Sequence, residues 1–140
     1  MNEALIRQRV ADLVKAIQAK DIDAVASHYA ADLVSFDFTP PLRSFGADEK
    51  RRNWHQAFAA LNGAIAYEVR DLKVTTNGEL GFAHSVNHIT ASPAGGRSTD
   101  IWLRWTACFR RIDGVWLIVH DHVSVPSDPA NGRAVLDLKP

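Results

Sequence analysis

The sequence predicts an α+β fold, a cone in which N-terminal helices pack inside a curved antiparallel sheet. Segments with helical periodicity dominate up to residue 61, and from residue 65 the side chains alternate with the period of a strand. Helices gathered at one end of a chain and strands joined by short turns at the other are typical of α+β folds. At 140 residues the chain predicts a single domain, residues 1–140, with a substantial core.

Three helices are expected before residue 62. Residues 2–20 carry apolar side chains at the spacing of one helical face, namely Ile6, Val10, Leu13, Val14 and Ile17. Asp21 or Asp23 can cap a second, shorter helix that extends to Ser27 or Tyr29. The third helix is expected over residues 47–61, where Trp54, Phe58 and Leu61 share a face before Gly63.

Strands are expected on both sides of that third helix. Residues 33–38 form the first, and Pro40-Pro41 ends it because proline cannot donate a hydrogen bond to a neighbouring strand. Residues 65–74 and 80–90 form a hairpin about the turn signal Asn77-Gly78. The first of these strands is expected to place Ile65, Tyr67, Val69 and Asp71 on one face. Residues 92–96 are expected to form a loop.

The densest part of the sequence is a second hairpin, residues 100–126, with its turn at Asp113-Gly114. Without a bulge, one face holds Leu103, Trp105, Ala107, Phe109, Trp116, Ile118, His120, His122 and Ser124. The other face holds Trp102, Arg104, Thr106, Cys108, Arg110, Leu117, Val119, Asp121 and Val123. Both faces are apolar in their middles, so we expect the helices to cover one and a second copy of the chain to cover the other. A bulge would change these faces.

Composition restricts the partners. The 16 basic and 16 acidic residues balance, which argues against nucleic acid as a partner. No apolar run approaches the roughly 20 residues that cross a bilayer, and the N-terminus lacks a secretory signal, so no membrane partner and a cytoplasmic location are expected. The lone Cys108 is expected to be a packing residue. No glycine-rich phosphate loop, serine-hydrolase elbow or CxxC pair occurs, and no cofactor is expected.

Five stretches that span nearly the whole chain resemble the SnoaL-like, ketosteroid-isomerase-like branch of the NTF2-like superfamily. They are FDFTPPLRSFGAD (36–48), YEVRDLKV (67–74), AHSVNHIT (83–90), residues 100–126 and LDLKP (136–140). Residues 100–126 also resemble the association domain of calcium/calmodulin-dependent kinase II. The resemblance implies a cone-shaped, usually dimeric barrel. It leaves function open, because a fold hosts many activities.

The resemblance places Asp37 where ketosteroid isomerases carry a general-base aspartate. Burial beside Phe36 and Phe38 would suit such a base, and the alternative is a carboxylate that caps the Pro-Pro turn. Those isomerases add a tyrosine from the first helix and a protonated acid on a late strand. This chain has no tyrosine in its first helix and offers Thr106 and Cys108 on the late strand, so steroid isomerase activity is not expected.

The histidines are the candidate partners of Asp37. His84 and His88 share one face of their strand, and His120 and His122 share one face of theirs. Of these, His84, His120 and His122 are candidate catalytic acids or bases, with polar surface positions as the alternative. The spacing does not match a specific metal motif, so no metal is expected.

The candidate ligand-binding residues are Trp54, Phe58, Asn87, Trp102, Arg104 and Asp121. Arg104 could receive a ligand carboxylate, or it could form an ion pair with Asp121 on the same face. The aromatic members would favour a flat, apolar ligand if they line a cavity.

Two functions therefore remain. The first is an isomerase, cyclase or dehydratase-type lyase that acts without a cofactor on a small apolar carbonyl or cyclic compound. The second is a non-catalytic domain that binds a ligand or forms dimers. The tail, residues 127–140, is expected to pack on the domain or on a partner subunit because Ala134 to Leu138 is apolar.

Overall fold

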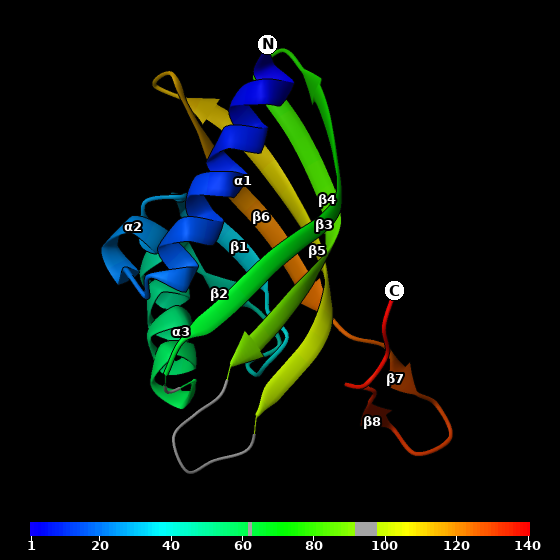
Figure 1. The fold of residues 1–140 in the computed structure, drawn as a ribbon. Coiled ribbons are helices and arrows are strands. Elements are labelled where there is room, and N and C mark those ends of the chain that lie inside the picture. The colour runs from blue at the N-terminus through cyan, green and yellow to red at the C-terminus, as the bar shows by residue number, and fades with distance from the viewer. Residues whose placement is uncertain (62, 92–97) are drawn as a thin grey trace.

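The computed structural model describes residues 1–61, 63–91 and 98–140. A six-stranded sheet curls around helix α1 (Asn2–Gln18), and the shorter α2 (Ile22–Ala26) and α3 (Gly46–Ala60) lie at one end of it (Figure 1). The strands of this sheet are β1 (Tyr29–Phe36), β2 (Ser44–Phe45), β3 (Ile65–Asn77), β4 (Leu80–Ala91), β5 (Thr99–Ile112) and β6 (Val115–Ser124). The predicted α+β class is confirmed. The predicted loop at 92–96 lies outside the described residues.

The strand order is β2-β1-β6-β5-β4-β3, so the sheet has two edges and does not close. Neighbouring strands are antiparallel except β1 and β6, which run parallel. That pairing brings the second half of β1 beside the C-terminal half of β6, although the two are far apart in the sequence.

Helix α1 fills the concave side of the sheet. Its buried side chains are Ile6, Val10, Leu13, Ala16 and Ile17, which includes most of the predicted stripe. They share a core with Trp105, Phe109, Trp116 and Ile118 from β5 and β6. The helix therefore covers one face of the sheet, and no helix of the described residues covers the other face (Figure 1).

The start of β1 differs from the prediction. The Asp21 side chain accepts a hydrogen bond from the Ala24 amide and caps α2, which ends at Ala26. Strand β1 then begins at Tyr29, because Tyr29 already pairs with Ile118 of β6. Tyr29 is therefore a sheet residue whose side chain is buried.

A bulge also changes the predicted face of β3. The register shifts between Arg70 and Lys73, and Asp71 has a left-handed backbone with φ of 57°. Beyond this point Leu72 and Val74 pack against the core, and Asp71 is exposed. The prediction that Asp71 shares the inner face was wrong, because an extra residue in a strand reverses the alternation after it.

The second hairpin turns at Asp113-Gly114 as predicted, with φ of 50° and 79°. Its β6 strand has a bulge: Cys108 pairs with His120 whereas Phe109 pairs with Ile118, which leaves Val119 as the extra residue. The predicted faces of β6 are therefore wrong beyond Val119.

Past this bulge, Asp121 and Val123 turn inward beside Ala107 and Trp105. His120, His122 and Ser124 turn outward, opposite Cys108, Thr106 and Arg104. A one-residue slip exchanges the two faces of a strand. The bulge therefore places the Asp121 carboxylate on the inner face, where the sequence predicted the imidazoles of His120 and His122.

The C-terminal segment forms a two-stranded ribbon, β7 (Ser127–Asp128) with β8 (Arg133–Ala134). The Val135 amide donates to the Pro126 carbonyl oxygen over 2.8 Å, and Leu136 and Leu138 remain about half exposed. Packing of this tail on the domain or on a partner stays a prediction. No helix among the described residues is long and apolar enough to cross a membrane.

Candidate functional site

A cavity of about 150 Å³ lies between α1, α3 and the concave face of the sheet. Its lining is mostly apolar, from Val10, Leu13 and Ile17 of α1 to Leu103 and Trp105 of β5. The polar lining residues are Tyr29, Asp37, Thr39, Lys50, Asn53, Tyr67, Asn87 and Asp121. An apolar cavity with a few convergent polar groups is the usual form of a small-molecule site.

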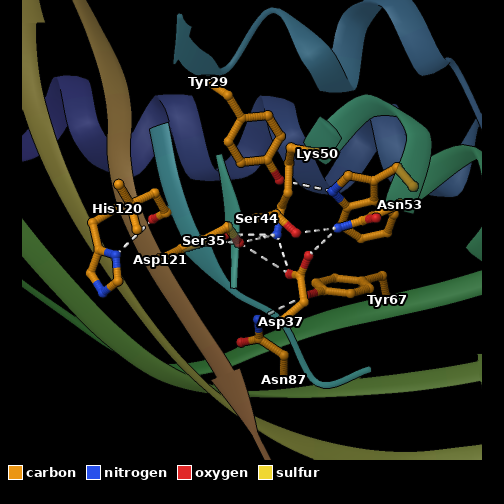
Figure 2. A network of polar contacts seen from close by, with 12 residues as sticks. Tyr29, Ser35, Asp37, Ser44, Lys50, Asn53, Tyr67, Asn87, His120 and Asp121 are labelled. Atoms are coloured by element: carbon orange, nitrogen blue, oxygen red, sulfur yellow. Dashed lines mark hydrogen bonds and ion pairs between the residues drawn. The ribbon is translucent and has the colours of Figure 1, made fainter. Parts of the chain in front are cut away.

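The cluster around Lys50 is the most strongly charged part of this wall (Figure 2). The Lys50 Nζ lies 2.5 Å from Asp37 Oδ1, 3.1 Å from Asp121 Oδ2 and 3.0 Å from Ser35 Oγ. The Ser35 hydroxyl also lies within hydrogen-bonding distance of both carboxylates and has one proton to donate to either. We call these four residues the Lys50 cluster.

The fold brings the cluster together from three elements. Lys50 and Trp54 are four residues apart on α3 and so share its inner face. Ser35 is two residues after the buried Leu33 on β1, and Asp37 follows two residues later in the same alternation. Asp121 is opposite Ser35 in the parallel register of β1 and β6.

Lys50 is charged and buried, with only 3% of its side chain exposed. Burial by itself lowers the pKa of Lys50, but the carboxylates of Asp121 and Asp37 act in the opposite direction, and the pKa is raised above its ordinary value. The ammonium form therefore persists at neutral pH.

Asp37 is held firmly but reaches the cavity. Besides Lys50, Asn53 Nδ2 donates to Asp37 Oδ2 over 2.7 Å, and the same nitrogen lies 3.1 Å from Ser44 Oγ. A carboxylate has about four lone-pair positions, so these contacts leave room for a proton from a ligand. Among the described residues no backbone amide donates to Asp37, which leaves the turn-capping alternative without a hydrogen bond.

Two phenols line the same cavity. Trp54 Nε1 donates to the Tyr29 hydroxyl over 2.9 Å, and Asn87 Nδ2 donates to the Tyr67 hydroxyl over 2.8 Å. Within the described chain, neither hydroxyl has an acceptor for its own proton. Ser85 Oγ donates to Asn87 Oδ1 over 2.7 Å, so Asn87 is fixed in the orientation that serves Tyr67. Each phenol can therefore donate to a ligand.

Both phenols are buried, and burial disfavours the charged phenolate. It raises the pKa of Tyr29 well above its usual range. It also raises the pKa of Tyr67, to about 12, although the Asn87 hydrogen bond and Lys50 act in the opposite direction. At neutral pH the two groups are neutral donors, which is the state needed to bind an oxyanion.

Four predicted residues line the cavity: Asp37, Trp54, Asn87 and Asp121. Phe58 is buried behind them, and its ring centroid lies 5.5 Å from that of Trp54. Asn87 acts on Tyr67, and Asp121 belongs to the Lys50 cluster, so both are engaged by protein partners.

The other five predicted residues lie on the outer face of the sheet: His84, Trp102, Arg104, His120 and His122. None of them lines the cavity. His120 Nδ1 lies 2.7 Å from the Val34 carbonyl oxygen, on the opposite side of β6 from the Lys50 cluster (Figure 2). The bulge at Val119 accounts for His120 and His122, which the sequence alone assigned to the same face as Trp105.

Arg104 and Trp102 have partners on that outer face. Arg104 Nε donates to Ser124 Oγ over 3.2 Å, and Asp121 lies on the other side of the sheet. The predicted ion pair of Arg104 and Asp121 was therefore wrong. The Trp102 ring stacks on His88 with centroids 4.4 Å apart, and the Arg70 guanidinium lies 4.5 Å from the same ring.

Sequence reasoning missed Lys50, Tyr29 and Tyr67. Lys50 had a signal, because it lies one turn before Trp54 and two turns before Phe58 on the inner stripe of α3. Tyr67 alternates with Ile65 and Val69, which predicts its strand face but assigns it no functional role. Among the described residues no group of three or more His, Cys, Asp or Glu side chains could hold a metal ion.

The sequence and the fold of the chain are similar to those of known proteins. The family model of the SnoaL-like domain matches residues 6–128. An NTF2-like protein of unknown function from Pseudomonas putida KT2440 is 31% identical, with a TM-score of 0.90 over 99% of this chain and 96% of that one. A ketosteroid isomerase-like protein from Erwinia carotovora atroseptica SCRI1043 is 24% identical, with a TM-score of 0.74 over 87% of this chain and 94% of that one.

The ketosteroid isomerase-like match and a more distant one are both below 25% identity and show the fold alone. A proposed dehydratase of the NTF2-like family from Streptomyces avermitilis is 16% identical, with a TM-score of 0.75 over 86% of this chain and 93% of that one. No curated protein matches the chain.

The two phenols can be titrated without interference, because Tyr29 and Tyr67 are the only tyrosines in the chain. A raised folded-state pKa contributes stability that is complete below the unfolded pKa, roughly 10 for tyrosine, and is lost as the pH rises above it. We therefore expect the ultraviolet absorbance of phenolate to stay absent through pH ~10 and to appear only as the circular dichroism of the fold is lost. Phenolate formation near the usual tyrosine pKa in a folded chain would contradict the buried geometry.

Proposed function

The chain belongs to the SnoaL-like family, and on that premise we propose that it is a cofactor-independent enzyme that transfers a proton on a small, apolar carbonyl compound. One observation supports this proposal most strongly. The Asp37 carboxylate and two neutral phenols with protons to donate line the same apolar cavity. The reaction class is isomerase or dehydratase-type lyase.

The volume of the cavity limits the reacting part of the ligand. A cavity of about 150 Å³ matches the volume that accommodates one benzene ring. A group of one ring, or an acyclic group of similar size, is therefore the expected fit. A fused four-ring steroid is larger than this cavity.

Asp37 is the proposed base. Lys50 and Asn53 fix the direction of its carboxylate, and correct placement of a catalytic group is a major part of rate acceleration. Asp37 takes a proton from the carbon next to the carbonyl, and the electrons of the broken C–H bond form the carbon–carbon double bond of an enolate. Return of the proton to another carbon completes an isomerisation, and its delivery to a departing β-hydroxyl as water leaves completes a dehydration.

Tyr29 and Tyr67 are the proposed donors to the carbonyl oxygen. Negative charge moves from Asp37 to that oxygen during the proton transfer, so the net charge of the cavity does not change. Neutral donors in a site with little water stabilise such a developing charge strongly. Trp54 and Asn87 act as positioning residues because they hold the phenol oxygens from behind.

Lys50 is proposed as a positioning residue rather than a nucleophile. A lysine that forms a Schiff base needs a lowered pKa so that the neutral amine is present. The pKa of Lys50 is raised, and its ammonium is occupied by two carboxylates. Covalent carbonyl chemistry at Lys50 is accordingly not part of the proposal.

We further propose that a second copy of the chain covers the outer face of the sheet. That face carries exposed apolar side chains, among them Leu80 and Phe82, and α1 packs on the opposite face. Exposed apolar area of this kind favours association between proteins.

Isomerisation of 3-cyclohexen-1-one to its conjugated isomer tests the proposed chemistry on a single ring. We expect the protein to accelerate this reaction above buffer, with solvent deuterium incorporated in D₂O. Asp37→Asn should lower the rate by about 10²–10⁴-fold because it removes the base. Tyr67→Phe should lower it by about 10²–10³-fold because it removes one donor to the oxyanion.

His55→Ala is the matched control, because His55 is exposed on α3 and lies outside the cavity lining. It should leave the rate unchanged. A rate equal to that of buffer, or one that Asp37→Asn does not reduce, would be evidence against the proposed base.

The dimer is tested by sedimentation. Thr106 is exposed on the outer face between His84 and His122 in neighbouring strands. We expect wild type to sediment as a dimer and Thr106→Arg as a monomer, because the added charge would be buried between copies. Gln56→Arg, on the exposed side of α3, is the control and should remain dimeric. A monomeric wild type would reject the interface.

A further inference from the structure

A second hollow adjoins the cavity at the end where β1 and β6 finish. It measures about 580 Å³, and we call it the outer depression. Asp37, Phe38 and Val123 line both spaces, so the outer depression begins at the proposed base. A ligand whose reacting ring lies in the cavity would extend into it.

The walls of the outer depression are largely apolar. Phe36 and Phe38 are each 37% exposed, and Leu42 is 93% exposed. Val125 and Ala134 complete the apolar wall from the segment after β6. Such exposed apolar groups gain stability when a ligand covers them.

The charges of the outer depression favour an anion. Asp37 is the one carboxylate among the described residues that line the outer depression, and this group is already paired with Lys50. Its one guanidinium, Arg43, lies 5.0 Å from the Phe45 ring and has no carboxylate partner among the described residues. His122 and Ser124 add polar atoms to the same wall. An arginine presents a planar set of donors that fits a carboxylate in a two-point contact.

We propose that the ligand carries a carboxylate on a short apolar arm, and that this arm occupies the outer depression with Arg43 as its partner. The inference rests on the proposed function, because the reacting ring is taken to occupy the cavity beside Asp37. It adds the substrate class: a small oxo or hydroxy ring compound with an acidic side chain. The outer depression is larger than the cavity, so the arm has room to bind there while the reacting ring occupies the cavity.

Calorimetric titration of three matched phenols tests the arm. A phenol ring resembles an enol in shape, and 4-ethylphenol, 3-(4-hydroxyphenyl)propanamide and 3-(4-hydroxyphenyl)propanoate differ only in the arm. We expect the propanoate to bind about threefold to tenfold more tightly than the amide, as for a partly exposed ion pair. The preference should shrink at high salt because salt screens exposed charges.

Arg43→Gln should abolish the preference for the propanoate and leave the affinity for the amide unchanged. Arg43 is exposed on a loop, so this variant is expected to fold. Arg52→Gln is the matched control, because Arg52 is 67% exposed on α3 and lines neither space. It should retain the preference.

The outcomes separate this inference from the proposed function. Equal affinities for the propanoate and the amide, or a preference that persists in Arg43→Gln, would overturn the anionic arm. In that case a neutral extension, the C-terminal segment or a second copy of the chain is the occupant of the outer depression. If no phenol binds, or if Asp37→Asn and Tyr67→Phe leave all three affinities unchanged, the cavity itself is not the ligand site and both proposals fail.

Discussion

The buried ammonium of Lys50 is the interaction on which the rest of the site depends. A lysine with 3% of its side chain exposed loses nearly all its hydration, and the protein must replace it. Asp37, Asp121 and Ser35 supply the replacement, and they come from the end of β1 and from β6. The cluster therefore fastens α3 to the parallel strand pair and fixes the direction of Asp37 at the same time.

The bulge in β6 is the backbone feature that makes this cluster possible. Without the extra residue Val119, Asp121 would face outward and the imidazoles of His120 and His122 would face the cavity. The cavity would then hold Lys50 beside histidines, which give a protonated amine no charge compensation at neutral pH. The bulge places a carboxylate where the lysine needs one, and it leaves the cavity with acid, amide and phenol groups.

The features that could be predicted from the sequence are those that depend on patterns among neighbouring residues. The apolar stripe of α1, the Asp113-Gly114 turn and the inner face of α3 all follow from spacing and turn chemistry. The bulges at Asp71 and Val119 did not follow, because a bulge is chosen by packing between strands rather than by a residue type. Family resemblance identified Asp37 as a candidate. Lys50 and Tyr67 were not identified, because each shares its face of the helix or strand with mostly apolar residues that predict core packing.

The unfolding free energy of Lys50→Met tests the cluster most directly. Removal of the ammonium leaves two carboxylates without their partner, so urea unfolding at neutral pH should show a loss of about 3–5 kcal/mol. Arg52→Met, on the exposed side of the same helix, should change stability by less than about 0.5 kcal/mol. The double variant Lys50→Met with Asp121→Asn should recover part of the loss, because one buried charge is gone. A Lys50→Met protein as stable as the Arg52→Met control, or a double variant whose losses simply add, would contradict the account.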